Sequence, residues 1–200
     1  MPSPDKLLAM PRIDNDKFYK NALKKHGANA KGLNWHDDES QLKRFEVIVA
    51  LIADDIQTGD IMIDAGCGFG DFYSYISAYH DIHYIGYDIV TENVTIAQER
   101  TNQPIMIKDI LHDTLENADF YIASGSMNIL SRFETFLFIE RCFMQSKKGF
   151  VFNLPYGKDE SRSFNYFLPQ EIKHFAKKFD CEVIETHGYL PHDFTVYLRK

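Results

Sequence analysis

Cysteine is scarce in this sequence of 200 residues, and positive charge is in the minority. The three cysteines, Cys67, Cys142 and Cys181, lie far apart and form no Cys-x-x-Cys pair. They offer neither a disulfide framework nor a zinc knuckle, so we expect a reduced, cytoplasmic protein. The net charge of −7 argues against broad binding to a nucleic-acid backbone, which needs a basic surface.

Long apolar runs are also absent. No stretch is long enough to cross a bilayer, and residues 1–16 lack the apolar segment of a secretory signal, so we expect no membrane association. Nothing in the sequence indicates an oligomeric state. One local cluster of positive charge lies near the N-terminus, where we expect a solvated helix face and keep RNA binding as the alternative: Lys17, Lys20, Lys24, Lys25 and Lys31.

From about residue 60 the sequence alternates short apolar runs with helical segments. Nearly continuous apolar runs are typical of parallel strands that helices cover on both faces. The pattern therefore predicts an α/β fold with a doubly wound, Rossmann-like, mostly parallel sheet. Because only a short turn joins the last two strands, we expect the last strand to run antiparallel. The predicted strands are 61–66, 82–89, 104–110, 119–124, 149–154, 182–189 and 193–200.

Predicted helices precede and separate these strands. The segment 131–146 opens with Ser131 and Glu134, the pattern of a capping box, and we expect Gly149 to cap its end. We expect one globular domain at 38–200, preceded at 1–37 by a helix and a loop that can act as a lid. The other predicted helices are 14–26, 38–56, 70–79, 91–100 and one that begins at Pro169.

The most informative stretch is 63–70, Ile-Asp-Ala-Gly-Cys-Gly-Phe-Gly, which leaves the first strand and enters a helix. α/β sheets bind nucleotide-like ligands at this place. The stretch fails the dinucleotide pattern GxGxxG, because Asp71 stands where the third glycine belongs, and no GK[ST] follows as in a phosphate-binding loop. Glycines let the backbone approach a ligand closely. Asp64 beside them suits a ligand with an ammonium group better than one with a pyrophosphate.

Two further acids end the next predicted strands. Asp88 ends the second strand, where it can accept hydrogen bonds from two ribose hydroxyls. Asp109 ends the third, where it can accept from an adenine amino group while the Ile110 N–H donates to a ring nitrogen. One ligand that combines an amino acid end, a ribose and an adenine is S-adenosylmethionine.

The ordered set of these motifs, with YIGYDI, KDI, ASGSMN and the closing strand pair, resembles the class I S-adenosylmethionine-dependent methyltransferases over roughly residues 40–200. The segments GLNW, QLKRF and HDFTVYLRK further resemble small bacterial members whose substrates are unassigned. The resemblance implies that Cys67 contributes its backbone rather than a nucleophile. The cofactor-binding residues that it implies are Asp64, Gly66, Cys67, Gly68, Gly70, Asp88, Ile89, Asp109, Ile110, Ser124 and Arg44.

A lid over the cofactor is a further expectation. Trp35, Gln41 and Arg44 can form it, with Arg44 facing the carboxylate of the cofactor. For Trp35 the alternative is a hydrophobic anchor of its loop.

Residues 153–156, Asn-Leu-Pro-Tyr, resemble the catalytic tetrapeptide of enzymes that methylate an adenine amino group in nucleic acid. In those enzymes the motif directly follows the fourth strand. Here residues 125–128 follow the fourth predicted strand, and Asn-Leu-Pro-Tyr ends the fifth. We therefore interpret it as a stretch without that catalytic role.

We expect no metal site. Metal-dependent methylation of catechols needs carboxylates after the fourth and fifth strands, where Ser124, Gly125 and Asn153 stand. His80 and His83 have the spacing of a ligand pair, but they span a helix end and a strand start, so we interpret them as a surface turn.

The resemblance implies in-line transfer of a methyl group, and we expect a small-molecule acceptor. An RNA or protein methyltransferase and a non-catalytic cofactor-binding module remain alternatives. The catalytic residues are unknown, with Asn128, Tyr156 and His192 as candidates and Asp193 beside them. We expect the segment 156–167 to form part of the acceptor pocket.

Overall fold

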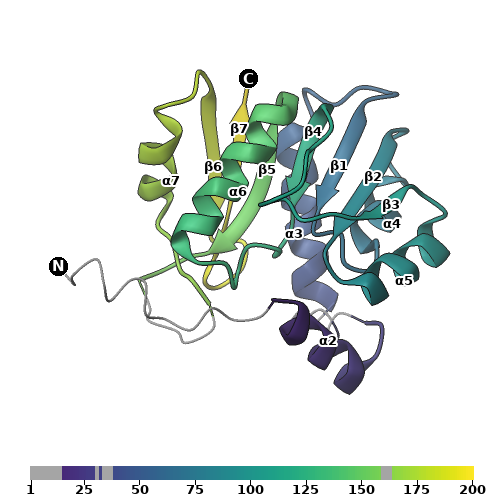
Figure 1. Ribbon diagram of the computed structural model, residues 1–200. Coiled ribbons are helices and arrows are strands. Elements are labelled where there is room, and N and C mark those ends of the chain that lie inside the picture. Colours follow the sequence, from purple (N-terminus) through teal and green to yellow (C-terminus); the bar gives the residue numbers. More distant parts are fainter. Residues whose placement is uncertain (1–14, 30–31, 33–37, 159–163) are drawn as a thin grey trace.

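A computed structural model describes residues 15–29, 32, 38–158 and 164–200 of the chain (Figure 1). Among these residues no helix is both long and apolar enough to cross a membrane. The strands are β1 (Ile61–Ala65), β2 (His83–Asp88), β3 (Ile105–Ile107), β4 (Ala118–Ala123), β5 (Ser146–Pro155), β6 (Glu182–His187) and β7 (Asp193–Arg199). The helices are α2 (Asn15–His26), α3 (Asp38–Ile52), α4 (Asp71–Ile76), α5 (Thr91–Thr101), α6 (Arg132–Gln145) and α7 (Pro169–Ala176).

The seven strands form one sheet in the order β3-β2-β1-β4-β5-β7-β6. The pairs from β3 to β5 are parallel, whereas β7 is antiparallel to both β5 and β6. The predicted mostly parallel sheet with an antiparallel last strand is therefore confirmed. Because chain order reverses between β1 and β4, the carboxyl ends of these two strands open the crevice where such sheets bind ligands.

Helices cover both faces of the sheet (Figure 1). Apolar residues of α3, α4 and α5, such as Phe45, Phe72 and Val94, pack in one cluster of buried residues with the side chains of one face. Residues of α6 and α7, such as Phe138 and Ile172, pack against the other face. This two-sided burial explains why the strands carry nearly continuous apolar runs.

The end of α6 differs from the prediction. Its start has the expected capping box, since Ser131 and Glu134 each accept from the backbone N–H of the other. The helix then passes directly into β5 at Ser146, so Gly149 lies inside the strand and does not cap the helix. A Cβ atom on Gly149 would lie 2.3 Å from the carbonyl oxygen of Leu198, so the close approach of β7 requires glycine there.

Helix α2 lies beyond the carboxyl ends of the strands, below the sheet in Figure 1. Lys20 of this helix lies 3.6 Å from Glu92 at the start of α5. The contact places α2 on the side of the sheet where the predicted ligand residues gather.

Tyr197 of β7 joins the inserted strand to the turn that follows α3. Its buried hydroxyl donates to Asp55 Oδ2 at 3.0 Å and lies 3.3 Å from the Lys148 carbonyl oxygen. We expect Tyr197→Phe to lower the free energy of unfolding in urea by about 1–2 kcal/mol, because a buried hydrogen bond is lost. Tyr79→Phe removes the hydroxyl of a tyrosine that is 68% exposed, and we expect a change within about 0.5 kcal/mol. Equal effects in the two variants would contradict this assignment.

Candidate functional site

The glycine loop follows β1, and its three glycines have left-handed backbone conformations that residues with a side chain rarely adopt. Gly66, Gly68 and Gly70 have φ angles of 90°, 56° and 80°. A Cβ atom on Gly66 would lie 2.3 Å from the Cβ of Ser126, in the loop after β4. The carbonyl of Tyr87 accepts from the N–H groups of Gly66 and Cys67 at 2.8 and 2.9 Å. The loop is thus held between β2 and the loop after β4, with its backbone at the carboxyl edge.

Asp88 ends β2 beneath this loop and is only 8% exposed. Its Oδ2 accepts from the Gly68 N–H at 2.9 Å and its Oδ1 from the Val90 N–H at 2.8 Å. Burial raises the pKa of Asp88 to about 6, although these backbone donors oppose the shift. Oδ1 also accepts from Asn93 Nδ2 at 3.4 Å, whereas Oδ2 keeps a lone pair beside the Gly68 bond for a further donor, such as a hydroxyl group.

Asp64 of β1 is 2% exposed and accepts a hydrogen bond from the hydroxyl of Tyr84 at 2.7 Å. Burial raises the pKa of Asp64 to about 7; the Tyr84 hydrogen bond opposes this shift, and the nearby carboxylates of Asp88 and Asp71 add to it. A positively charged group beside Asp64 would favour its ionised form. The site therefore suits a cation.

The loop after β3 carries Asp109 and Ile110. Asp109 Oδ1 accepts from the Leu111 N–H at 2.8 Å, and its Oδ2 lies 2.7 Å from Nδ1 of His112. Within the described part of the chain, the N–H of the buried Ile110 has no hydrogen-bond acceptor. An amide donor therefore remains available for a ligand at the position that the sequence predicts.

The loop after β4 is braced by Asn153 of β5, which is 1% exposed. Its Oδ1 accepts from the Gly125 N–H at 2.8 Å, and its Nδ2 donates to Ser124 Oγ at 3.3 Å. Ser126 Oγ donates to the Ala65 carbonyl at 2.7 Å and so ties this loop to β1. The Asn-Leu-Pro-Tyr stretch ends β5, as predicted, and its asparagine holds the neighbouring loop.

Arg44 of α3 has a partner that the sequence does not reveal. It forms an ion pair with the buried Asp193 at the start of β7, and its Nη1 donates to the Ser40 carbonyl at 3.2 Å. Burial raises the pKa of Asp193 to about 6, and the Arg44 guanidinium opposes this shift. Gln41, one turn away, donates to Asp71 Oδ2 at 3.2 Å, so α3 spans the edge from α4 to β7. The predicted contact of Arg44 with a cofactor carboxylate stays a prediction, and Trp35 lies outside the described residues.

The candidate catalytic residues fall into two places. The Tyr156 N–H donates to the His192 carbonyl at 2.9 Å, so these two are neighbours. The Tyr156 ring is 38% exposed and parallel to the ring of His187, with 5.9 Å between centroids. The Asn128 carbonyl instead accepts from the Asn165 N–H at 3.0 Å. All three residues follow strands at the carboxyl edge, Asn128 after β4, Tyr156 after β5 and His192 after β6.

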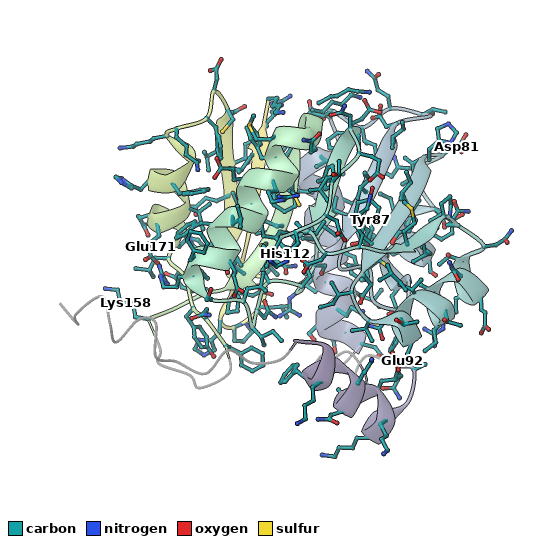
Figure 2. The ribbon with its side chains drawn as sticks, in the orientation of Figure 1. Asp81, Tyr87, Glu92, His112, Lys158 and Glu171 are labelled. Carbon is teal, nitrogen blue, oxygen red and sulfur yellow. The ribbon has the colours of Figure 1, made fainter. Side chains whose placement is uncertain are left out.

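His80 and His83 lie far from this edge. They flank Asp81, which Figure 2 shows at the end of the sheet opposite to Glu92 and α2. Within the described ranges, no group of three or more histidine, cysteine, aspartate or glutamate side chains could hold a metal ion. Cys67 is buried, and burial raises the pKa of its thiol well above the usual value, so it is a poor nucleophile.

No protein-family model matches the sequence, and no curated protein matches it. Solved structures do match the fold. Magnesium protoporphyrin IX methyltransferase from Synechocystis PCC 6803, solved with bound S-adenosylmethionine, is 16% identical, with a TM-score of 0.72 over 94% of this chain and 98% of that chain. An S-adenosylmethionine-dependent methyltransferase from Clostridium acetobutylicum is 10% identical, with a TM-score of 0.65 over 92% and 96% of the two chains.

The chain has the fold of the class I S-adenosylmethionine-dependent methyltransferases. A TehB-like methyltransferase from Corynebacterium glutamicum shares this fold at 16% identity, with a TM-score of 0.60 over 81% of this chain and 97% of that chain. The methyltransferase fold places the glycine loop, Asp88 and Asp109 at one edge of the sheet. Sequence reasoning missed Tyr84, whose hydroxyl donates to Asp64, and Tyr87, whose carbonyl accepts from the glycine loop, and it gave Asn153 no bracing role.

The raised pKa of Asp64 predicts a stability effect of known sign. In the unfolded chain the pKa of an aspartate is about 3.9, whereas in the folded chain that of Asp64 is about 7. Protonated Asp64 therefore makes its full contribution to the free energy of unfolding below pH 4, and this contribution is lost as the pH rises through about 7. We expect Asp64→Asn to be more stable than the wild type at pH 8, by up to about 4 kcal/mol, with the difference vanishing near pH 4. Urea unfolding at both pH values measures it.

Asp119→Asn is the control with the opposite sign. Partial burial acts to raise the pKa of Asp119, but the Ile61 N–H and the Lys147 ammonium outweigh it and lower that pKa. This variant should lose stability at pH 8. A loss of stability at pH 8 in Asp64→Asn as well would show that the Asp64 carboxylate is not strained by burial.

Proposed function

We propose that this protein is an S-adenosylmethionine-dependent methyltransferase. The observation that carries the proposal is the pair of buried carboxylates, Asp64 and Asp88, on either side of a glycine loop that exposes backbone at the edge of the sheet. S-adenosylmethionine carries positive charge at its ammonium and sulfonium groups and hydroxyls on its ribose. Both features match these two carboxylates, which form no ion pair with a side chain in the described part of the chain.

The residues present fit this cofactor from one end to the other. Asp64 would hold the ammonium group, and Asp88 with the neighbouring Ile89 would hold the ribose. Asp109 and the Ile110 N–H would hold the adenine. The glycine loop would bring its backbone to the cofactor, and Gly66 lets this loop pack against Ser126, with which a side chain would collide. Gly68, Gly70, Cys67 and Ser124 complete the set from the two loops that meet there.

In this proposal, bound S-adenosylmethionine supplies a methyl group that is already activated for displacement. The residues of the chain therefore need mainly to align the acceptor atom and to exclude water, and alignment alone can lower a barrier by several kcal/mol. Asn128, Tyr156 and His192 are the polar candidates to orient the acceptor or to take a proton from it. A base is required only where the acceptor atom loses a proton.

The acceptor in this proposal is a small molecule. The net charge of −7 supports this choice, because RNA binding favours a basic surface. The fold match to magnesium protoporphyrin IX methyltransferase gives an example of the same architecture acting on a small molecule. An RNA or protein acceptor would instead require the lysines of α2, and of these Lys20 lies beside Glu92.

The residues before α3 act as a lid in this proposal. Arg100 donates to the Ala28 carbonyl at 2.6 Å, and a Cβ atom on Gly32 would lie 3.5 Å from the ring of Phe69 in the glycine loop. These contacts bring the N-terminal segment to the loop that would bind the cofactor.

Asp88→Ala tests the cofactor. Loss of a carboxylate that accepts from two ribose hydroxyls should raise the Kd for S-adenosylhomocysteine at least about a hundredfold, since hydrogen bonds to charged groups contribute about 1.5–3 kcal/mol each. A thermal-shift titration with S-adenosylmethionine, S-adenosylhomocysteine and NAD measures it. At about 100 times Kd, the wild type should gain roughly 2.7 kcal/mol, or several degrees in Tm.

Asp180→Ala, in an exposed turn before β6, is the matched control and should bind as the wild type does. The proposal would be refuted if the Tm of the wild type rose with NAD alone, or if none of the three ligands raised it. Binding without methyl transfer to small molecules, RNA or protein in extracts with radiolabelled cofactor would instead indicate a non-catalytic binding module. Label in RNA or protein would replace the small-molecule acceptor.

A further inference from the structure

Tyr87, Lys108 and Glu116 form a cluster beside the glycine loop that the cofactor assignment leaves unexplained; we call these three residues the clamp. Tyr87 precedes Asp88 at the end of β2, and Lys108 precedes Asp109. The Tyr87 hydroxyl donates to Glu116. Lys108 Nζ donates to both carboxylate oxygens of Glu116 at 2.6 and 2.8 Å and lies 5.0 Å from the centre of the Tyr87 ring.

The clamp joins the two ends of the segment between β3 and β4. This segment contains Asp109 and Ile110. The Leu111 N–H donates to Asp109 within it, and Arg141 of α6 donates to its Asp113 carbonyl. Lys108 stands at its start and Glu116 near its end, so their ion pair closes the segment into a loop. Tyr121 of β4 also donates to the Glu116 carbonyl at 2.6 Å. The loop is therefore fixed to the sheet at Glu116.

Tyr87 links this loop to the other half of the site. Its carbonyl accepts from Gly66 and Cys67 in the glycine loop, while its side chain reaches Glu116. The Lys108 N–H donates to the Asp88 carbonyl at 3.0 Å, so backbone bonds run in parallel with the side-chain contacts. Tyr87 is fully buried, so its ring is packed by neighbouring atoms on all sides.

We propose that the clamp is a positioning device that fixes the Asp109–Ile110 loop relative to Asp88 and the glycine loop, and so sets the affinity of the site for the adenosine part of its ligand. The inference rests on the proposed function. A binding group gains affinity when its partners are held in place before the ligand arrives, because less ordering remains to be done. Without these side-chain contacts, the Asp109–Ile110 loop would occupy several positions, and the Ile110 N–H would have to be ordered when the ligand binds.

Tyr87→Phe and Lys108→Ala test the clamp without touching a residue assigned to the ligand. We expect each to raise the Kd for S-adenosylhomocysteine and for adenosine about tenfold, the size of effect typical when a supporting residue behind a binding group is removed. The two effects should be less than additive in the double variant, because both act through Glu116. Lys108→Arg keeps the ion pair and should restore most of the affinity. Isothermal titration measures these constants.

Lys147→Ala is the matched control. Lys147 pairs with Asp119 at 3.2 Å at the opposite end of the sheet, so this variant loses an ion pair of the same kind and should keep the wild-type Kd. An unchanged adenosine Kd in folded Tyr87→Phe and Lys108→Ala would overturn the proposal and leave the clamp a stability feature. Should either variant fail to fold, Glu116→Gln, which removes the charge that Tyr87 and Lys108 share, decides between the same two results. A wild type that binds neither ligand would refute the proposed function instead.

Discussion

The burial of carboxylates at the carboxyl edge of the sheet is the constraint on which the site depends. An ionised carboxylate is costly to bury unless hydrogen bonds or charges compensate it. Asp88 accepts from the backbone N–H groups of Gly68 and Val90, whereas Asp64 accepts from the hydroxyl of Tyr84. This difference accords with the higher pKa of Asp64, about 7 against about 6. The less compensated acid is therefore the one that gains most from a bound cation.

Glycine geometry and the buried acids are two parts of one arrangement. The positive φ of Gly68 turns its N–H toward Asp88, and the missing side chain of Gly66 lets the loop after β4 come close. That second loop is held in turn by Asn153, whose position on β5 explains why a motif-like tetrapeptide stands one strand too late for nucleobase chemistry. Contacts that run from β2 across β1 and β4 to β5 thus fix a single edge.

The sequence predicts most of this fold because the strands are apolar runs of the right length and the helices separate them. The antiparallel position of β7 follows from the short turn before it. The end of α6 could not be predicted from local signals, because Lys-Lys-Gly is typical of a helix end, whereas the need for Gly149 comes from Leu198 on a strand nearly 50 residues later. The local pattern predicts a helix cap at Gly149, whereas long-range packing against β7 places this glycine inside a strand.

Among the candidate site residues, too, some positions can be predicted from the local sequence and others depend on long-range packing. Asp64, Asp88 and Asp109 stand at strand ends next to glycines or turns, so their place in the sequence predicts their place in the site. The partner of Arg44 could not be found from its position in a helix, because Asp193 is 149 residues away and meets it only after β7 enters the sheet. The clamp of Tyr87, Lys108 and Glu116 is hidden for a related reason: each residue looks like an ordinary strand or loop position until β2, β3 and β4 align. Residues that contact a ligand can form a recognisable local motif in the sequence. Residues that support those ligand contacts are recognised only from the folded structure.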